Sequence, residues 1–544
     1  MSGRTVARGV AGAAALIAAL TLLARLAGFG RTLVFTNTVG AGSTGDTYLA
    51  ANTVPNIVFE VVAGGALASL VVPMLAGGIA TGDREQVRRT ASALLGWTLL
   101  ILTPLAVAVA LAAEPIAELL LGGGSSAEVA LGARFLLVFA PQVVLYGIGI
   151  VLTGVLQAHR RFAGPALAPL LSSLVVAAAY LLFAGIGGSG DIGDLSTPAE
   201  VVLGVGTTLG VVALTLSLLV PVRGLRLGVR PTLRFPVGAA PRVRRLAVAG
   251  VLTLAGQQAV AAVAIRLAND GPDGTQVVYF AGLTLFLVPW AALAVPLATS
   301  AYPGLAERAE VGDEAGYRRS LAPAAVLTLA ASAVAAGVLV AVSGPMARVF
   351  LVSAPAATVA ALRDTIIAFA PGLVGYALVA LLTRALYARG LWKAPTVCVV
   401  GGWLLAVVAD VVLAQLLPPE HRGLALGAGH SIGVTVAGVG LLVVVARVAG
   451  PGVLRGVPRS GAAAVTGSAL GAVAGLLVAR ALGADPVPLT GVLVAVAVGL
   501  VAAAVVLVIA AAVMMGTARA SLAGAVQALR TPDDQRAATT GGAR

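Results

Sequence analysis

Residues 24–75 read ARLAGFGRTLVFTNTVGAGSTGDTYLAANTVPNIVFEVVAGGALASLVVPML, and this stretch places charged side chains inside the first two apolar segments of the chain. The charged residues that matter most are Arg25, Arg31, Asp46 and Glu60. A charge at membrane depth costs on the order of 3 kcal/mol unless it faces a polar cavity or a partner of opposite charge. We therefore expect this stretch to line a polar cavity inside a bundle of membrane helices.

The composition is that of a protein with many membrane spans. The chain has 544 residues, of which 59% are hydrophobic and only 10% are charged, and its mean hydropathy is +1.02. A soluble protein of this size cannot bury so much apolar surface. The single Cys398 excludes an internal disulfide, and His159, His421 and His430 share no ligand spacing. No nucleophile–base pair, phosphate loop or metal motif is present, so we expect a transporter, not an enzyme, without a cofactor or a nucleic-acid partner.

Windows of about 20 apolar residues predict fourteen spanning helices. They are expected at residues 10–37, 47–79, 90–112, 131–157, 165–187, 199–220, 243–268, 276–302, 321–342, 362–387, 395–417, 423–447, 461–482 and 489–515. Pro289 and Pro296 interrupt the eighth of these spans. Prolines are tolerated in membrane helices where neighbouring groups satisfy the freed carbonyls.

Basic residues are distributed unevenly between the loops on the two sides. If the N-terminus is inside, 27 of the 35 Lys and Arg residues lie on the inner side and six on the outer side, while Arg25 and Arg31 lie within a span. This excess predicts that both termini are cytoplasmic. The six outer residues are Arg134, Arg266, Arg348, Arg363, Arg422 and Arg480.

The chain contains an internal repeat. Residues 139–165 align without gaps onto residues 369–395, with ten identities in 27 positions, and the same offset of 230 places Pro73 on Pro303. Repeats that are six spans apart have the same orientation, as in two-lobed transporters. We expect an all-α polytopic membrane protein with 14 transmembrane helices, forming two parallel six-helix lobes plus two extra C-terminal helices. Its parts are the N-lobe at 1–220, a basic cytoplasmic linker at 221–242, the C-lobe at 243–447, the extra pair at 448–516 and a cytoplasmic tail at 517–544.

Several motifs resemble those of one family of membrane proteins. GFGR (28–31), GAGSTGDTYLAANTVPN (40–56) and VVPML (71–75) resemble the opening of the MurJ/MviN family of lipid II flippases. RRFAGPALAPLL (160–171) is similar to the signature after the family's fourth span, and ARGLWKAP (388–395) is similar to its second-lobe copy.

The resemblance implies a function as well as a fold. It implies the multidrug/oligosaccharidyl-lipid/polysaccharide superfamily and a place in the bacterial cytoplasmic membrane. It also implies that the protein flips a polyprenyl-pyrophosphate-linked peptidoglycan precursor, lipid II, to the outer leaflet by alternating access, in the service of cell-wall biogenesis and cell shape. The expected partners are this lipid, membrane lipids and cell-wall synthesis proteins, with transport coupled to the membrane potential or to an ion.

At three places the chain departs from the family pattern. Phe59 and Gly282 stand where the family has arginines, and Thr32 stands where it has an acidic residue. Two other functions therefore remain open: a flippase for another polyprenyl-linked glycan, and a non-transporting paralogue that acts as a membrane scaffold.

A flippase needs cations that hold a pyrophosphate, and arginine binds phosphate oxygens through two parallel hydrogen bonds. The candidate substrate-binding residues are Arg25, Arg31, Asp46, Asn56, Glu60, Gln257 and Gln258. Arg25 and Arg31 either face a cavity or extend to the outer interface. Since they are six positions apart, about 120° around a helix, they share a face only if Gly28 and Gly30 bend it.

Each of the other candidates has a structural alternative. Glu60 either neutralises one of the two arginines or takes up a coupling proton or cation. Asp46 is either a contact or the N-cap of the second span, and Asn56 either contacts substrate or satisfies a carbonyl freed by Pro55. The remaining pair, Gln257 and Gln258, either contacts the headgroup or forms hydrogen bonds between helices.

Overall fold

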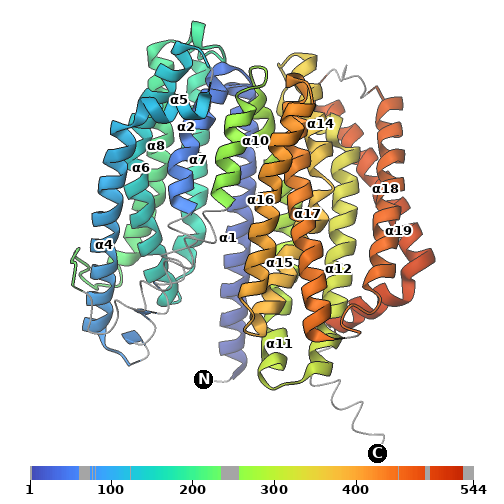
Figure 1. The fold of residues 1–544 in the computed structure, drawn as a ribbon. Coiled ribbons are helices and arrows are strands. Elements are labelled where there is room, and N and C mark those ends of the chain that lie inside the picture. The colour runs from blue at the N-terminus through green and yellow to red at the C-terminus, as the bar shows by residue number, and fades with distance from the viewer. Residues whose placement is uncertain are drawn as a thin grey trace, which may run out of the picture. The chain divides into compact units, whose positions relative to one another are not determined.

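A computed structural model describes residues 3–60, 71, 74–75, 78–79, 81–122, 124–234, 257–450, 452–483 and 491–530. Every regular element in this part of the chain is a helix, which confirms the all-α class (Figure 1). The chain divides into two compact units, Met1–Val277 and Val278–Arg544.

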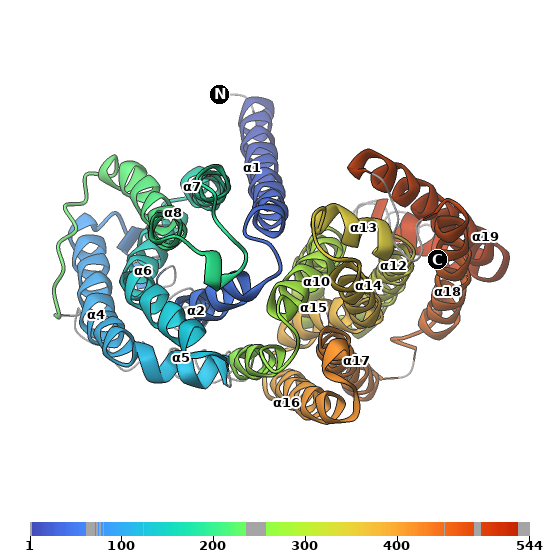
Figure 2. The same ribbon diagram turned by 90° about the horizontal axis from the view of Figure 1, so that it is seen from above.

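The first unit contains seven named α-helices among its described residues. They are α1 (Gly3–Thr38), α2 (Ser43–Glu60), α4 (Arg84–Leu111), α5 (Ala113–Leu121), α6 (Ser126–Ala158), α7 (Ala163–Gly185) and α8 (Thr197–Arg223). A further helical segment covers residues 257–268. Seen from above, α6 lies beside α4, α2 and α8 (Figure 2), and it packs against all three.

The second unit begins within α10 and contains the remaining helices. They are α10 (Thr275–Pro289), η3 (Trp290–Ala294), α11 (Val295–Glu310), α12 (Glu314–Ala341), α13 (Ser343–Phe350), α14 (Ala356–Phe369), α15 (Gly372–Ala388), α16 (Lys393–Leu416), α17 (Arg422–Ala449), α18 (Val457–Ala481) and α19 (Val492–Arg530). The helix α17 packs against α14, α15 and α16.

Among the described residues, eleven helices are long and apolar enough to cross a membrane, and the bent pair α14–α15 makes twelve. These correspond to twelve of the fourteen predicted spans. The other two were predicted at 47–79 and 243–268, and both fall partly outside the described residues. The tail predicted to start at 517 begins inside α19, whose helix continues to Arg530 across a kink at Ala518.

The prolines of the eighth span change its helix geometry without ending it. Thr275–Glu310 is one continuous span, and the π-helical turn Trp290–Ala294 follows directly after Pro289. A π-turn is one of the local adjustments that satisfy backbone groups near a proline in a membrane helix. The indole nitrogen of Trp290 also donates to the carbonyl of Tyr376 at 3.3 Å, which fixes this turn against α15.

The helix bounds repeat with the offset that the sequence predicted. The starts of α4, α5, α6 and α7 precede those of α12, α13, α14 and α16 by the same offset of 230 in each pair. The short helices α5 and α13 were not predicted, because each is far below the length of a membrane span. The N-caps agree as well: Asp83 accepts a hydrogen bond from the third residue of its helix, and Asp313 does the same at the equivalent place in the second repeat.

Small residues let the last two helices approach closely. A Cβ atom at Gly471 would lie 3.0 Å from the Cα atom of Val506, and one at Gly467 would lie 3.2 Å from that of Ala510. Both contacts are tighter than most Cβ contacts, so the glycines of α18 permit the backbone of α19 to pack against it.

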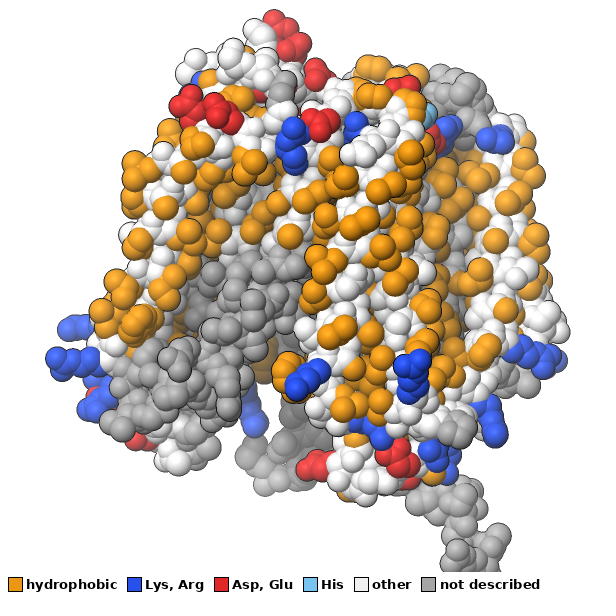
Figure 3. Space-filling model, in the orientation of Figure 1, with side chains coloured by type: hydrophobic (Ala, Val, Ile, Leu, Met, Phe, Trp, Pro, Cys, Tyr) orange, Lys and Arg blue, Asp and Glu red, His pale blue; other side chains and the backbone are white. Residues whose placement is uncertain are grey.

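In each unit, apolar side chains cover the middle of the visible helices and charged ones gather near their ends (Figure 3).

Candidate functional site

The first helix presents its two arginines to different surroundings. The helix α1 runs from Gly3 to Thr38 and passes through Gly28 and Gly30. Arg25 is exposed and Arg31 is half-buried. Neither forms an ion pair with any residue that the structure describes, so within this part of the chain both cations lack an acidic partner.

Arg31 lies near three tyrosines, of which Tyr48 and Tyr180 are buried and Tyr146 is half-buried. Its charge interacts with the hydroxyl groups of Tyr48, Tyr146 and Tyr180. The hydroxyl of Tyr48 is within 2.8 Å of that of Tyr180 and also within 2.8 Å of the Thr207 Oγ1 atom. A chain of hydroxyl groups from three helices therefore lies within electrostatic range of this guanidinium.

Asn56 belongs to the same polar region. The hydroxyl of Tyr146 donates to the Asn56 Oδ1 atom at 3.2 Å, and the Asn56 Nδ2 atom donates to the carbonyl of Asn52 at 2.8 Å. The ring of Phe59 packs against Tyr146 with ring centroids 4.6 Å apart.

Asp46 is buried and acts as a helix cap, although not for the helix that the sequence suggested. Its carboxylate accepts hydrogen bonds from the backbone N–H groups of Gly274 at 2.7 Å and Val277 at 2.9 Å, at the start of α10. The prediction that it is the N-cap of the second span was wrong, because α2 begins at Ser43 and Asp46 lies in its first turn. Both carboxylate oxygens satisfy N–H groups that an α-helix leaves without partners.

The remaining candidates are not part of this arrangement. Glu60 is exposed at the end of α2 and forms no ion pair with Arg25 or Arg31, so the expected neutralisation of either arginine is absent from the structure. Gln257 and Gln258 are both half-buried at the start of the segment 257–268. No hydrogen bond of either side chain to a described residue is present.

The structure thus brings together Arg31 and Asn56, and it links them through Tyr146. The sequence analysis did not select the tyrosines Tyr48, Tyr146 and Tyr180 as site residues. One signal was available, because Tyr146 is among the identities of the internal repeat. Tyrosine hydroxyls buried in a membrane protein also need partners, so three tyrosines in apolar spans could have been read as a polar network.

The second unit holds a different buried cluster. His430 is surrounded by aromatic rings, with centroid distances of 5.3 Å to Phe286, 5.3 Å to Phe369 and 5.4 Å to Trp403. Asp410 of α16 is 1% exposed, and its Oδ1 atom has no hydrogen-bond partner in the described part of the chain. No group of three or more His, Cys, Asp or Glu residues placed to hold a metal occurs in the described part of the chain.

Sequence comparison relates the chain to known flippases. The profile of the family described as "Lipid II flippase MurJ" matches residues 35–482. A lipid II flippase MurJ from Burkholderia cenocepacia is 24% identical over 429 residues, which cover 76% of this chain and 80% of that protein. A probable lipid II flippase MurJ from Vibrio cholerae is 33% identical over 106 residues, which span only 19% of this chain and 20% of that protein.

Solved structures agree on the fold. A lipid II flippase MurJ in an inward closed conformation superposes with a TM-score of 0.72 at 18% identity, covering 92% of this chain and 99% of the other. An inward-facing multidrug resistance transporter of the MATE family, in the MOP superfamily, gives a TM-score of 0.65 at 14% identity over 80% of this chain and 98% of its own. Since the family profile covers well over half of the sequence, the resemblance is confirmed, and the chain belongs to the MurJ family of lipid II flippases.

Proposed function

We propose that this protein flips lipid II from the inner to the outer leaflet of the bacterial inner membrane by alternating access. Family membership supports the reaction, and one observation connects it to particular residues: Arg31 is half-buried among tyrosine hydroxyls without an acidic partner in the described residues. A guanidinium in that position is costly unless an anionic ligand joins it. The pyrophosphate of lipid II is such a ligand.

The residues around Arg31 have distinct parts in this proposal. Arg31 binds the pyrophosphate through parallel N–H donors. Arg25, exposed on the same helix, binds the anion as it enters or leaves. Tyr146 and Asn56 offer a hydroxyl and an amide to the sugar and peptide groups of the headgroup, exchanging their mutual hydrogen bond for contacts with substrate. Asp46 holds the start of α10 and does not contact the anion, since its charge would repel it.

The orientation of the protein in the membrane belongs to the same proposal. The 27 basic residues of one set of loops face the cytoplasm, together with both termini. Arg389 at the end of α15 pairs with Glu314 at the start of α12 at 2.7 Å, and both belong to that set of loops. The energy for net transport comes from the membrane potential or from an ion gradient, and cell-wall synthesis proteins receive the product.

A second candidate substrate, another polyprenyl-linked glycan, is favoured by one observation. The positions of two family arginines hold Phe59, which packs on Tyr146, and Gly282, where a Cβ atom would lie 2.8 Å from the Thr365 side chain. At Gly282 a longer side chain would require the neighbouring helix to repack. A cavity with fewer cations suits a headgroup that carries less negative charge.

The test is whether the full-length gene restores growth to bacteria depleted of their lipid II flippase. The exposure of the lipid II headgroup on the outer leaflet is measured in the same cells. We expect the wild type to restore both, and the Arg25→Ala, Arg31→Ala double variant to lower exposure about 100-fold, since two charge-assisted contacts are lost. Arg25→Lys should retain part of the activity, and Glu60→Gln should be milder still.

Arg134→Ala is the matched control, because Arg134 is an arginine of the first unit that pairs with Glu200 at 2.6 Å. It should transport as the wild type does, with equal amounts of every variant in the membrane. Full activity of the double variant would refute the role of the two arginines. The second candidate substrate would be established by two results together. None of the proteins would restore growth, and the wild type would flip another polyprenyl-linked glycan in vesicles.

A further inference from the structure

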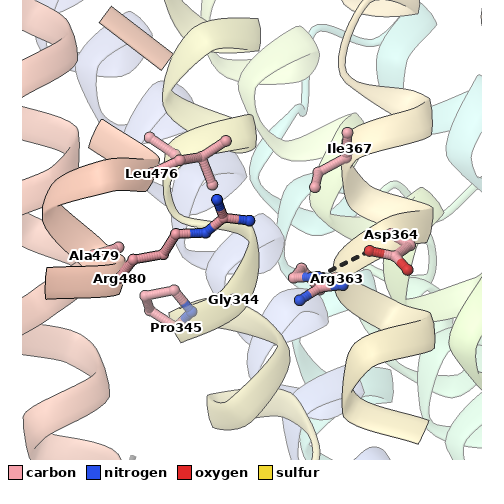
Figure 4. A pocket seen from close by; sticks show the side chains of 9 residues that line it. Gly344, Pro345, Arg363, Asp364, Ile367, Leu476, Ala479 and Arg480 are labelled. Carbon is pink, nitrogen blue, oxygen red and sulfur yellow. Dashed lines mark hydrogen bonds and ion pairs between the residues drawn. The ribbon is translucent and has the colours of Figure 1, made fainter. Parts of the chain in front are cut away.

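A cavity of about 220 Å³, lined by both charged and apolar residues, lies within the second unit between α13, α14 and α18. Its charged lining residues are Arg363 and Asp364 of α14 and Arg480 of α18. The side chain of Arg480 extends from α18 towards α14, on whose near side Arg363 and Asp364 lie (Figure 4).

The charges of this cavity favour an anion. The lining side chains include two guanidinium groups and one carboxylate, and Arg363 Nε donates to Asp364 Oδ1 at 2.8 Å. Gly344 and Pro345, at the N-terminus of α13, also line the cavity. A helix N-terminus adds positive potential.

The position of these arginines is unusual for this chain. Only six basic residues fall on the side that the loop charges assign to the outside, and two of them, Arg363 and Arg480, line the same cavity. The positive-inside distribution explains why basic residues are rare on that side. It does not explain why two of these six basic residues, Arg363 and Arg480, line one cavity. The cavity is at the end of the spans, where lipid phosphates are located.

An apolar groove adjoins the cavity. It has a volume of about 630 Å³, and it runs between the α14–α15 bend and α17, lined by Pro371, Leu424, Ile432 and other mostly apolar side chains. Asp364 and Ile367 line both the cavity and the groove, so the two share a wall. A charged pocket that continues into an apolar groove matches a ligand with an anionic head and a hydrocarbon tail.

We propose that this composite site binds an anionic phospholipid of the outer leaflet, with its phosphate at Arg363 and Arg480 and an acyl chain in the groove beside Pro371. The apolar groove favours a lipid over a free anion. The site lies entirely within the second unit, whereas the proposed pyrophosphate contacts Arg25 and Arg31 belong to the first. It is thus a lipid site separate from those contacts, through which membrane composition acts on the protein.

The first arm of the test concerns the headgroup. Native mass spectrometry measures the affinity of the purified full-length protein for phosphatidylglycerol and for phosphatidylcholine. Arg480→Gln leaves the Arg363–Asp364 pair intact, and it should weaken phosphatidylglycerol binding on the order of tenfold, the loss of one charge-assisted contact. Arg480→Lys should recover part of that loss. Arg348→Gln is the matched control, since Arg348 lies in α13 but does not line the cavity, and it should bind as the wild type does.

The second arm concerns the tail. Ala428 lines the groove on α17, whereas Val439 is exposed on the same helix but does not line it. Ala428→Trp should fill the groove and weaken phosphatidylglycerol binding several-fold, and Val439→Trp should not. Equal affinity for phosphatidylcholine, no effect of Arg480→Gln, or equal effects of both tryptophans would each overturn the proposal. So would displacement of the lipid by inorganic pyrophosphate, or a preference for polyprenyl pyrophosphate over phosphatidylglycerol. Flipping assays with the same variants measure lipid II transport separately, so a failure of the phospholipid proposal can be told apart from a failure of the transport proposal.

Discussion

Tyr146 in α6 and Tyr376 in α15 occupy equivalent places in the two repeats, and their neighbours differ. Tyr146 donates a hydrogen bond to Asn56 and lies near the charge of Arg31. Tyr376 stacks on Trp290, with ring centroids 4.6 Å apart, in a cluster of other aromatic rings. Both tyrosines contact an aromatic ring, but Tyr146 also forms a hydrogen bond with an amide, whereas Tyr376 lies within a larger aromatic cluster.

A second equivalent pair shows what the repeats have kept. Pro141 and Pro371 occupy the same place, and in each unit a hydroxyl donates to the carbonyl of the third residue before the proline: Thr208 at 3.0 Å and Ser431 at 2.7 Å. In the first unit α6 continues through its proline, whereas in the second the chain breaks into α14 and α15, bent by 43°. At Gly372, just after the break, the absence of a side chain lets Ser431 approach the backbone and accept its N–H at 3.2 Å.

The difference teaches that the backbone and the side chains of the repeats are under separate constraints. A proline inside a membrane helix leaves the carbonyl four residues before it without its helical N–H donor, and in both repeats a hydroxyl donates to the carbonyl that follows that one. No such requirement fixes the side chains around the two tyrosines. Transport chemistry is therefore expected to depend on the first repeat, and the second should contribute mainly to stability at the corresponding positions.

The largest expected effect tests this division at one pair of equivalent positions. Phe286 is the counterpart of Asn56 at the repeat offset, is 1% exposed, and contacts three other rings. Phe286→Ala should lower the free energy of unfolding by about 3 kcal/mol, because it opens a cavity in a packed aromatic cluster. Asn56→Ala should change it by less than about 1 kcal/mol, yet reduce transport. Denaturation in detergent and headgroup exposure are the two measurements, and the reverse pattern would contradict the division of roles.

The next prediction concerns the break at Pro371. A Cβ atom at Gly372 would lie 2.7 Å from the Ser431 Oγ atom and 2.8 Å from its Cα atom, so α17 would have to move. Gly372→Ala should therefore destabilise the protein by about 2 kcal/mol. In the first repeat, Gln142 follows the proline and donates to Thr208 at 2.8 Å. Gln142→Ala removes one hydrogen bond and should cost only about 1 kcal/mol. Thermal denaturation compares the pair, and equal losses would show that the break is not sterically specified.

A smaller effect is expected at the caps. Asp46→Ala leaves the N–H groups of Gly274 and Val277 without their acceptor, which should cost about 1.5 kcal/mol. Gln276, its counterpart at the repeat offset, is 3% exposed, and its Oε1 atom has no hydrogen-bond partner. Gln276→Leu should therefore be neutral or slightly stabilising, since it removes an unsatisfied polar atom. A destabilised Gln276→Leu protein, measured by the same denaturation, would mean that this side chain has a role the contacts do not reveal.

Much of the fold could be predicted from the sequence, because membrane spans are encoded by hydropathy alone. The offset of 230, found in residues 139–165, recurs in the starts of four helix pairs. What escaped prediction was short or local. The helices α5 and α13 are too short for a span-sized window, and the π-turn after Pro289 depends on how the neighbours satisfy the backbone.

The candidate site was less predictable, because side-chain pairing across helices leaves little trace in a single sequence. Arg31 and Asn56 were named from their polarity in apolar segments, and the structure links them through Tyr146. Their roles in substrate binding remain predictions. Asp46 was recognised as a possible cap, but the helix it caps starts far away along the chain, at Thr275. Polarity identifies residues that need partners, and only the fold identifies the partners.

The smallest expected effect isolates the hydrogen bond that distinguishes the first repeat. Tyr146→Phe removes the hydroxyl that donates to Asn56, while the ring keeps its contact with Phe59 at 4.6 Å. The free energy of unfolding should change by less than about 1 kcal/mol, since a single half-exposed hydrogen bond is lost. Headgroup exposure on the outer leaflet should fall about threefold, because the same hydroxyl is proposed to contact the substrate.

A double-mutant cycle shows whether the two side chains act as one unit in that step. If Tyr146 orients the Asn56 amide for the headgroup, then Asn56→Ala already removes what Tyr146→Phe would remove, and the double variant should transport no worse than Asn56→Ala alone. If the two act independently, their fold-losses multiply. If the losses of transport multiply, the hydrogen bond between Tyr146 and Asn56 has no role in transport. The polar contribution of the first repeat would then come from Arg31 and the other residues near it. Non-additive losses would establish that Tyr146 and Asn56 act as one unit. The second repeat lacks this unit, because Phe286 occupies the place that corresponds to Asn56.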